Sequence, residues 1–414
     1  MTLIKACKPY LSYIFSNRNF PTPILMATIS LCLIGQFFIY SATITLPDNL
    51  FMKQLVSLGI GLVIIILLQL FSYRYIFNLA PFLYVFSIIA LIAVFFFGRT
   101  VSGSTRWFNL GFFNIQPSEI AKIAVTLMMA FYLNHLKPPL DHWKYLAGVF
   151  GIIMLPMALV LKQPDLGTAL IFFILMIPMI FWRGFKPITI IFIVLPIINI
   201  VAAFNIWTWF IFVFLMLFLL YISKFQLRII IFLFLLNTSI GILTPYLWNH
   251  LHDYQKQRII VFLDPSKYKL TSGYHIIQSK VSIGSGGMFG KGLLKGTQKN
   301  LDFLPEKQTD FIFSVIGEET GFFGCMVVIG LFMIIFIYSI QIAMETRNLF
   351  GQLMVVGITS ILFFQMLINI GMTIGIMPVT GIPLPFISYG GSSLLTNMIL
   401  IGFILNIGRH RYEY

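Results

Sequence analysis

Twelve apolar stretches, separated mostly by short charged turns, restrict what this sequence can fold into. Each is close to the about 20 residues that an α-helix needs to cross the hydrocarbon core of a bilayer. Helices are the expected spanning form, because backbone groups in lipid must find their hydrogen bonds within the segment. With 59% hydrophobic and 10% charged residues, an ordinary soluble protein is excluded. The sequence therefore predicts an all-α polytopic membrane protein with about 12 transmembrane helices, at residues 23–43, 52–72, 76–97, 116–135, 144–161, 165–182, 187–204, 206–222, 227–247, 309–340, 350–373 and 389–408.

Lysine and arginine are distributed unevenly over the segments between these stretches. With the N-terminus placed inside, thirteen basic residues fall on inner segments and four on short outer loops. Cytoplasmic loops of membrane proteins carry such an excess. Both termini are therefore expected in the cytoplasm, and the long loop before the last three spans outside. The inner residues are Lys5, Lys8, Arg18, Arg74, Lys137, Lys144, Arg183, Lys186, Lys224, Arg228, Arg347, Arg409 and Arg411, and the outer ones are Lys53, Arg99, Arg106 and Lys162.

The net charge of +14 fits this orientation and contact with anionic membrane lipids. Nucleic acid is not expected as a partner, because the chain has no basic groove interleaved with aromatic residues. Cys7, Cys32 and Cys325 are too far apart for a metal or redox motif. Two outer segments are distinctive: residues 98–117 are an amphipathic mixture suited to the membrane interface, and residues 248–308 form a large loop that we expect to be partly folded.

The stretch FLPEKQTDFIF, residues 303–313, places the carboxylate of Asp310 at the edge of an apolar segment. An acid at this boundary costs free energy unless it is paired or solvated, and it is a functional candidate by default. On a helix, Asp310, Ser314 and Glu318 share one face, which indicates a polar cavity. The alternatives are that Asp310 caps the helix N-terminus, and that Glu318 and Glu319 pair with basic residues elsewhere in the bundle.

Glu119 and Lys122, in the motif QPSEIAK, are spaced for an i, i+3 ion pair at the start of the fourth span. An intact buried pair adds little net stability, although the loss of one partner costs several kcal/mol. Charged pairs within membranes tend to line substrate or ion paths, so a cavity-lining role and a structural pair both stay open. Asp165, in KQPDLGT at the start of the sixth span, is expected to join them from the same outer side.

Two glycine-rich segments are further candidates. In residues 273–292, exposed backbone N–H groups near Lys280 and Lys291 suit phosphate oxygens, although the Walker spacing is not met; a flexible loop is the alternative. Residues 375–393 interrupt an apolar region with prolines and paired glycines. Non-helical backbone at membrane depth is tolerated only against protein or a watery cavity. This stretch is predicted to be a re-entrant cavity wall with Ser388 as its polar contact, the alternative being a plain helix–loop–helix connection.

Six motifs cover most of the chain outside residues 187–247: RWFNLGFFNIQPSEIAK (106–122), KQPDLGTAL (162–170), HDYQKQRIIVFLDP (252–265), SGYHIIQSKVSIGSGGMFGKGLLKGTQ (272–298), FLPEKQTDFIFSVIGEE (303–319) and PVTGIPLPFISYGGSS (378–393). In this order they resemble the SEDS family (shape, elongation, division and sporulation), and its RodA branch in particular. The resemblance implies one membrane domain over residues 1–414, with the family's typical ten spans. Residues 187–247 depart from it, because they hold three apolar runs where the family has one, and so predict two extra spans.

The resemblance implies a peptidoglycan glycosyltransferase that polymerises lipid II on the outer face of the bacterial cytoplasmic membrane during cell-wall elongation. Family members act with a class B penicillin-binding protein, the crosslinking transpeptidase. Asp310 matches the family's catalytic Asp and is expected to be the general base. A divalent cation, Mg or Mn, is a candidate cofactor, although no carboxylate cluster defines a metal site. Further substrate contacts are expected at Arg106, Trp107, Glu119, Lys122, Asp165, Gln278, Lys280, Glu306, Thr309, Ser314 and Ser388.

Two other classes of function compete with the enzyme. Many spans, intramembrane charges and a broken helix also suit a transporter, here a lipid II flippase. A transporter, however, needs acids near the bilayer midplane, whereas Asp310, Glu119 and Asp165 lie at the outer ends of their predicted spans. A non-catalytic scaffold fits the hydrophobicity but leaves Asp310 unexplained. The enzyme is therefore the favoured hypothesis and the flippase its alternative.

Overall fold

The structure is a computed structural model that describes most of the chain. The described residues are 20–44, 49–101, 104–109, 114–140, 143–223, 225, 227–250, 256, 260–262, 264, 268, 273–297 and 307–412. Each of the twelve predicted apolar stretches forms one helix, with ends within five residues of those expected. These helices are α2 (Thr22–Thr43), α3 (Leu50–Leu68), α4 (Arg74–Phe97), α5 (Pro117–His135), α6 (Trp143–Lys162), α7 (Leu166–Arg183), α8 (Pro187–Ala202), α9 (Ile206–Ile222), α10 (Leu227–His250), α14 (Ile312–Glu345), α15 (Leu349–Thr373) and α16 (Gly391–Arg409).

Nine of these helices, counted over the described residues, are long and apolar enough to cross a membrane. The other three are α5, α8 and α9. Helices α8 and α9 have only 16 and 17 residues, and α5 carries Glu119 and Lys122 in its first two turns. The polytopic all-α class is therefore confirmed, while the number of spans stays a prediction.

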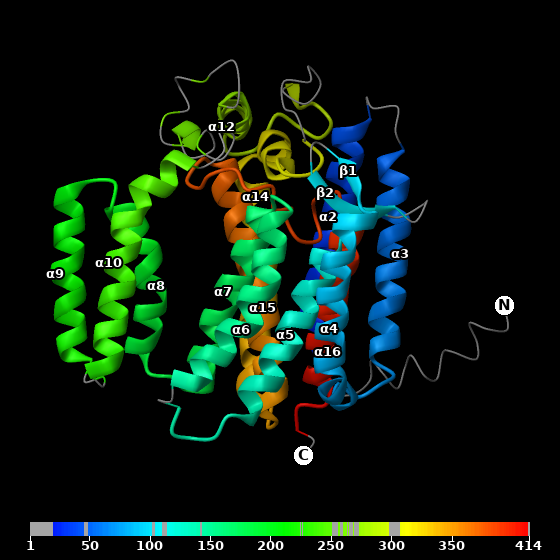
Figure 1. The fold of residues 1–414 in the computed structure, drawn as a ribbon. Helices are drawn as coiled ribbons and strands as arrows, with labels where there is room; N and C mark the ends of the chain where they lie inside the picture. Colours follow the sequence, from blue (N-terminus) through cyan, green and yellow to red (C-terminus); the bar gives the residue numbers. More distant parts are fainter. Residues whose placement is uncertain are drawn as a thin grey trace.

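The end of the bundle opposite the C-terminus carries a small sheet and a short helix, α12 (Tyr274–Gly286) (Figure 1). Strands β1 (Arg99–Val101), β2 (Ser104–Asn109) and β3 (Asn114–Ile115) pair antiparallel in that order. The prediction of an amphipathic interface segment at residues 98–117 did not include strands. This segment is rich in β-branched and aromatic residues, which favour a pleated sheet.

Helix α15 is the centre of the bundle and packs against α14, α7, α5 and α16. Helix α3 packs chiefly on α16, and α4 on α5, so that one apolar core runs through most of the molecule. Helices α8, α9 and α10 stand to one side in Figure 1 and are joined to the rest through α7. They share a second, smaller core made of Phe192, Leu195, Phe212, Met216 and Leu220. The predicted extra spans therefore pack mainly on one another.

Candidate active site

Asp310 lies in the turn that precedes α14 and is partly exposed. Its carboxylate oxygen Oδ2 faces Gly381, because a Cβ built on that glycine would lie 3.6 Å from it. Asn369 of α15 donates from Nδ2 to Asp310 O (3.0 Å) and to Ile382 O (2.8 Å). The N-cap position of α14 belongs to Phe311. One buried amide thus holds the turn of Asp310 beside the chain around Gly381.

Residues 374–390, between α15 and α16, are non-helical, as the prediction of a re-entrant segment requires. The Ser388 hydroxyl donates to Thr309 O (2.6 Å) and accepts from Leu384 N (2.8 Å). Gln54 of α3 donates from Nε2 to Ser388 O (3.3 Å). Ser388 is therefore the polar contact of this segment, as expected, but it binds the protein backbone and positions the turn that carries Asp310.

Asp165 is the N-cap of α7 and accepts through Oδ1 from Thr168 N (3.1 Å). Arg106 of β2 places Nη1 4.0 Å from Asp165 Oδ2, and its Nε donates to Gln163 O (2.8 Å). Gln116, just before α5, donates from Nε2 to the same carboxylate oxygen (3.2 Å). The structure therefore brings Arg106 and Asp165 together, which the sequence analysis did not predict, and ties the sheet to the starts of α5 and α7.

The first turn of α7 lies against the same broken segment as Asp310. A Cβ built on Gly167 would meet Thr380 O at 2.9 Å and Ile382 Cγ1 at 2.7 Å. Only glycine permits such a close approach between a helix and a neighbouring backbone. The short stretch 380–382 therefore lies close both to Gly167, two residues after Asp165, and to the carboxylate of Asp310.

Glu119 and Lys122 form the expected ion pair, with 2.8 Å between Lys122 Nζ and Glu119 Oε1. Both side chains are almost completely buried, at 5% and 2% exposure. The second oxygen, Glu119 Oε2, has no hydrogen-bond partner among the described residues. The predicted pair is confirmed, whereas a direct contact of either group with substrate stays a prediction.

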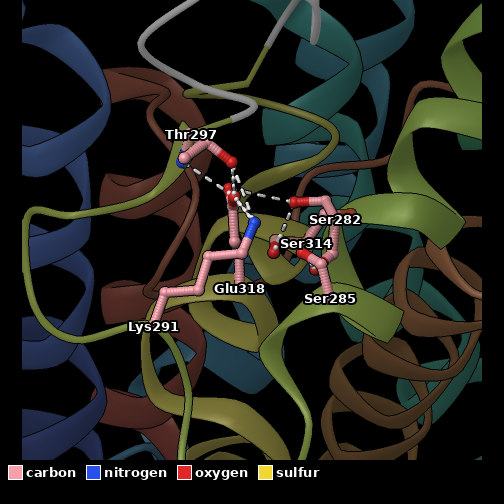
Figure 2. A network of polar contacts seen from close by, with 6 residues as sticks. All are labelled: Ser282, Ser285, Lys291, Thr297, Ser314 and Glu318. Carbon is pink, nitrogen blue, oxygen red and sulfur yellow. Dashed lines mark hydrogen bonds and ion pairs between the residues drawn. The ribbon is translucent and has the colours of Figure 1, made fainter.

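Figure 2 shows Glu318 at the centre of a polar network. Lys291 Nζ lies 2.7 Å from Glu318 Oε1, and Thr297 donates to the same oxygen from its N (2.8 Å) and its hydroxyl (3.0 Å). Ser282 of α12 donates to Ser314 O (3.2 Å) and to Glu318 Oε2 (3.3 Å). Glu318 is fully buried, so the alternative in which it pairs with a basic residue is confirmed.

Ser314 shares this buried face of α14 with Glu318. It has no exposed surface, and its hydroxyl lies 2.6 Å from that of Ser279. Because α14 begins only at Ile312, Asp310 precedes the helix and the predicted common face of all three polar residues is wrong. Ser314 in this structure holds α12 against α14 and offers no surface to a substrate.

Helix α14 is interrupted at Gly321, where φ is 67° and ψ is −160°. Backbone groups freed by such a break need other partners. Lys291 N donates to Glu318 O (2.9 Å), and Gly292 N donates to Glu319 O (3.1 Å). The hypothesis that this glycine-rich turn cradles phosphate is therefore wrong for these two N–H groups, which complete the broken helix instead.

The remaining predicted contacts lie around the same end of the bundle. Lys280 of α12 is exposed. Its side chain packs against the backbone of Gly375, because a Cβ built on that glycine would lie 2.5 Å from Lys280 Nζ. Gln278 of α12 and Trp107 of β2 are partly exposed. Glu306 lies outside the described residues. Helix α12 also confirms that the long loop at residues 248–308 is partly folded.

Gln54 and Asn369 are residues of the candidate site that sequence reasoning missed. Each is a fully buried amide, with 0% exposure, within a predominantly apolar helix. An isolated amide in a predicted span was the available signal, because a buried polar side chain needs a partner. Over the part of the chain that the structure describes, no three His, Cys, Asp or Glu side chains form a metal-binding group, so no reaction step is assigned to a divalent cation.

A partly exposed acid, a buried ion pair and broken backbone at one end of an apolar helical bundle define a polytopic membrane protein with a polar site at that end. The sequence model of the FtsW, RodA and SpoVE family, described as a cell cycle protein, matches residues 22–209 and 188–413. The chain belongs to this family.

Two curated relatives are similar over most of their length. The peptidoglycan glycosyltransferase MrdB of Escherichia coli is 38% identical over 366 residues, which cover 87% of this chain and 85% of the relative. The peptidoglycan glycosyltransferase RodA of Treponema pallidum is 35% identical, with 94% of this chain and 97% of the relative covered. This chain therefore aligns with nearly whole relatives, not with fragments of them.

Solved structures agree with this assignment. A chain from a study of the structural coordination of polymerization and crosslinking by a peptidoglycan synthase complex is 29% identical and has a TM-score of 0.72, with 95% of this chain and 99% of that chain covered. The rod shape determining protein RodA of Thermus thermophilus is 28% identical, with a TM-score of 0.63 and coverage of 94% and 97%. The fold of the family therefore extends over almost all of this chain.

Proposed function

We propose that this protein is a peptidoglycan glycosyltransferase that polymerises lipid II into glycan strands, with Asp310 as its general base. Both curated relatives described above are named peptidoglycan glycosyltransferases, which supports the reaction class. The observation that carries the role of Asp310 is its position: a partly exposed carboxylate faces Gly381, and Asn369 and Ser388 fix the two backbone segments on either side of it.

The chemistry needs only one base. The sugar C1–O bond to the lipid pyrophosphate breaks, and the pyrophosphate leaves with the bonding electron pair. The acceptor sugar's hydroxyl oxygen forms the new bond to C1, and its proton passes to Asp310. Pyrophosphate is already a good leaving group, so the second carboxylic acid that glycosidases use to protonate their leaving group is not needed.

Positive charge near the site supports the departure of the pyrophosphate. Lys280 is exposed, and the Arg106 side chain is 25% exposed; these two are the proposed phosphate contacts. Lys122 is buried against Glu119, so we assign it to holding the start of α5 in place. The exposed phenylalanines of the bundle provide an apolar surface for the polyprenyl tails.

The excess of basic residues on the predicted inner segments supports cytoplasmic termini and a site on the outer face of the bacterial membrane. The small sheet and α12 lie at the end of the bundle that this orientation places outside (Figure 1), and α14, which Asp310 precedes, begins there. A structural neighbour comes from a complex that couples polymerization to crosslinking. This supports a class B penicillin-binding protein, which would crosslink the new strands, as the partner.

The test is polymerisation of purified lipid II by the detergent-solubilised protein, alone and with its transpeptidase partner. A detergent micelle has no separate leaflets between which a lipid could be moved, and a flippase forms no glycosidic bond. A flippase would therefore yield no glycan in this assay. Asp310→Asn is expected to keep the unfolding midpoint and to lose polymerisation by at least 100-fold, within the usual range for a general base. Glu345→Gln, which also changes a carboxylate to an amide but at the opposite end of the bundle, is the control. Full activity of Asp310→Asn would remove Asp310 from the mechanism.

A further inference from the structure

A cavity of about 170 Å³ lies between α4, α5 and α15, and is lined by Arg74, Phe77, Asn134, Asn348 and Phe350. Arg74 is the first residue of α4, and Asn348 is the N-cap of α15. Both lie at the C-terminal end of the bundle, because Asn406 of α16 binds the turn before α4 (to Phe71 O, 2.7 Å) and Asn348 follows the far end of α14. The cavity is therefore separated from Asp310 by the length of α14.

The charge in this cavity belongs to Arg74. Two of its guanidinium nitrogens, Nε and Nη2, are buried and have no hydrogen-bond partner within the described ranges. No acidic side chain lines the cavity. Arginine stays protonated in proteins, and a buried donor that lacks an acceptor costs about 1–3 kcal/mol. An oxyanion that enters the cavity would accept from this planar fork of donors, for which carboxylate and phosphate have matching geometry.

The rest of the lining adds to the same preference. The carboxamides of Asn134 and Asn348 supply neutral donors. Helices α4 and α15 both begin here, so the positive ends of two helix dipoles point towards the same space. Phe77 and Phe350 pack edge to face, with ring centroids 5.0 Å apart, and close the apolar side. The cavity thus combines a fixed positive charge with an apolar wall.

Its size limits the ligand. At about 170 Å³, the cavity is many times larger than the about 10–15 Å³ that a single bound water needs on the same measure. That is enough for a phosphate group but not for the disaccharide–peptide of the proposed substrate. We propose that this cavity is a second site that binds a phosphate group, from either a lipid headgroup or a soluble phosphate. The site is independent of the proposed glycosyl transfer.

The experiment measures the unfolding midpoint of the purified full chain in a neutral detergent while a probe is added. The probes are inorganic phosphate and dioctanoyl phosphatidylglycerol, and dioctanoylglycerol is the control that lacks phosphate. A ligand that binds the native state alone raises the midpoint with concentration. We expect one or both phosphate probes to do so and dioctanoylglycerol not to. Stabilisation by the lipid alone would assign the phosphate to a headgroup, and stabilisation by both would admit a soluble source.

Two variants separate binding from folding. Arg74→Gln is expected to weaken the probe at least tenfold, whereas Arg228→Gln, which removes the same charge from the exposed start of α10, leaves binding unchanged. Asn134→Asp introduces a carboxylate beside Arg74; it is expected to raise the midpoint without probe and to abolish the response to phosphate. The proposal is overturned if neither phosphate probe stabilises the wild type, or if Arg74→Gln and Asn134→Asp respond to the probes as the wild type does.

Discussion

The Glu119–Lys122 pair allows the sharpest test of how the site is held in place. Only 2.8 Å separates the charged atoms, and the side chains are 5% and 2% exposed. Removing one partner from such a pair leaves an uncompensated buried charge and costs about 3–5 kcal/mol. Glu119→Gln and Lys122→Met are each expected to lower the free energy of unfolding by that amount. Little else can compensate, since Glu119 Oε2 lacks another hydrogen bond within the described part of the chain.

The double variant distinguishes a mutual pair from two separate roles. With both charges removed, no buried charge is left alone, and apolar replacement of an ion pair is often close to neutral. The coupling free energy from the double-mutant cycle is therefore expected to be at least about 3 kcal/mol. A charge-swapped variant, Glu119→Lys with Lys122→Glu, keeps the pair. It places a positive charge in the first turn of α5, which costs only about 0.3–1 kcal/mol.

The assay is equilibrium unfolding in mixed micelles, followed by lipid II polymerisation at a temperature where every variant is folded. Both single variants are expected to be less active than the swapped one, because an unpaired buried charge displaces the start of α5. Additive losses, with coupling under about 0.5 kcal/mol, would refute the mutual pair. Equal loss of activity in the single and swapped variants, without matching loss of stability, would make the two residues separate substrate contacts.

Two further predictions concern the break in α14. Gly321→Ala is expected to lower the unfolding free energy by at least about 2 kcal/mol, because φ is positive there and the new Cβ would lie 2.4 Å from Gly290 N. The control is Gly330→Ala, where the space around the new Cβ is open. It is expected to be neutral or to stabilise the protein by up to about 1 kcal/mol. Equal unfolding midpoints for these two variants would contradict the proposed backbone strain at position 321. Lys291→Met is expected to cost about 2 kcal/mol by removing the cation that lies 2.7 Å from the buried Glu318 carboxylate. This is less than for a fully buried pair, because the Lys291 side chain is 27% exposed. Lys295→Met, on the exposed part of the same loop, is the control and is expected to leave the unfolding midpoint unchanged. An equal loss of stability in Lys295→Met would show that the effect comes from the loss of a positive charge in this loop and not from the Lys291–Glu318 pair.

The helices could be predicted because the length of an apolar run and the thickness of a bilayer are enough to define them. Local spacing also predicted the Glu119–Lys122 pair, since residues three apart on one helix are neighbours. The contact between Asp310 and Gly381 joins residues far apart in sequence and follows only from the packing of α15. The glycine-rich turn was misassigned for the same reason, because nothing local shows that its N–H groups are taken up by a helix that breaks at Gly321.

The small core shared by α8, α9 and α10 has a consequence for how this chain can vary. The two stretches that match the family model overlap at residues 188–209, within α8 and the start of α9. A unit that stabilises itself and meets its neighbours mainly through α7 is insulated from the geometry around Asp310. Mutations on its outward surface are therefore expected to leave the arrangement of Asp310, Gly381 and Asn369 unchanged, so that this part of the chain can vary in sequence without disturbing the candidate active site.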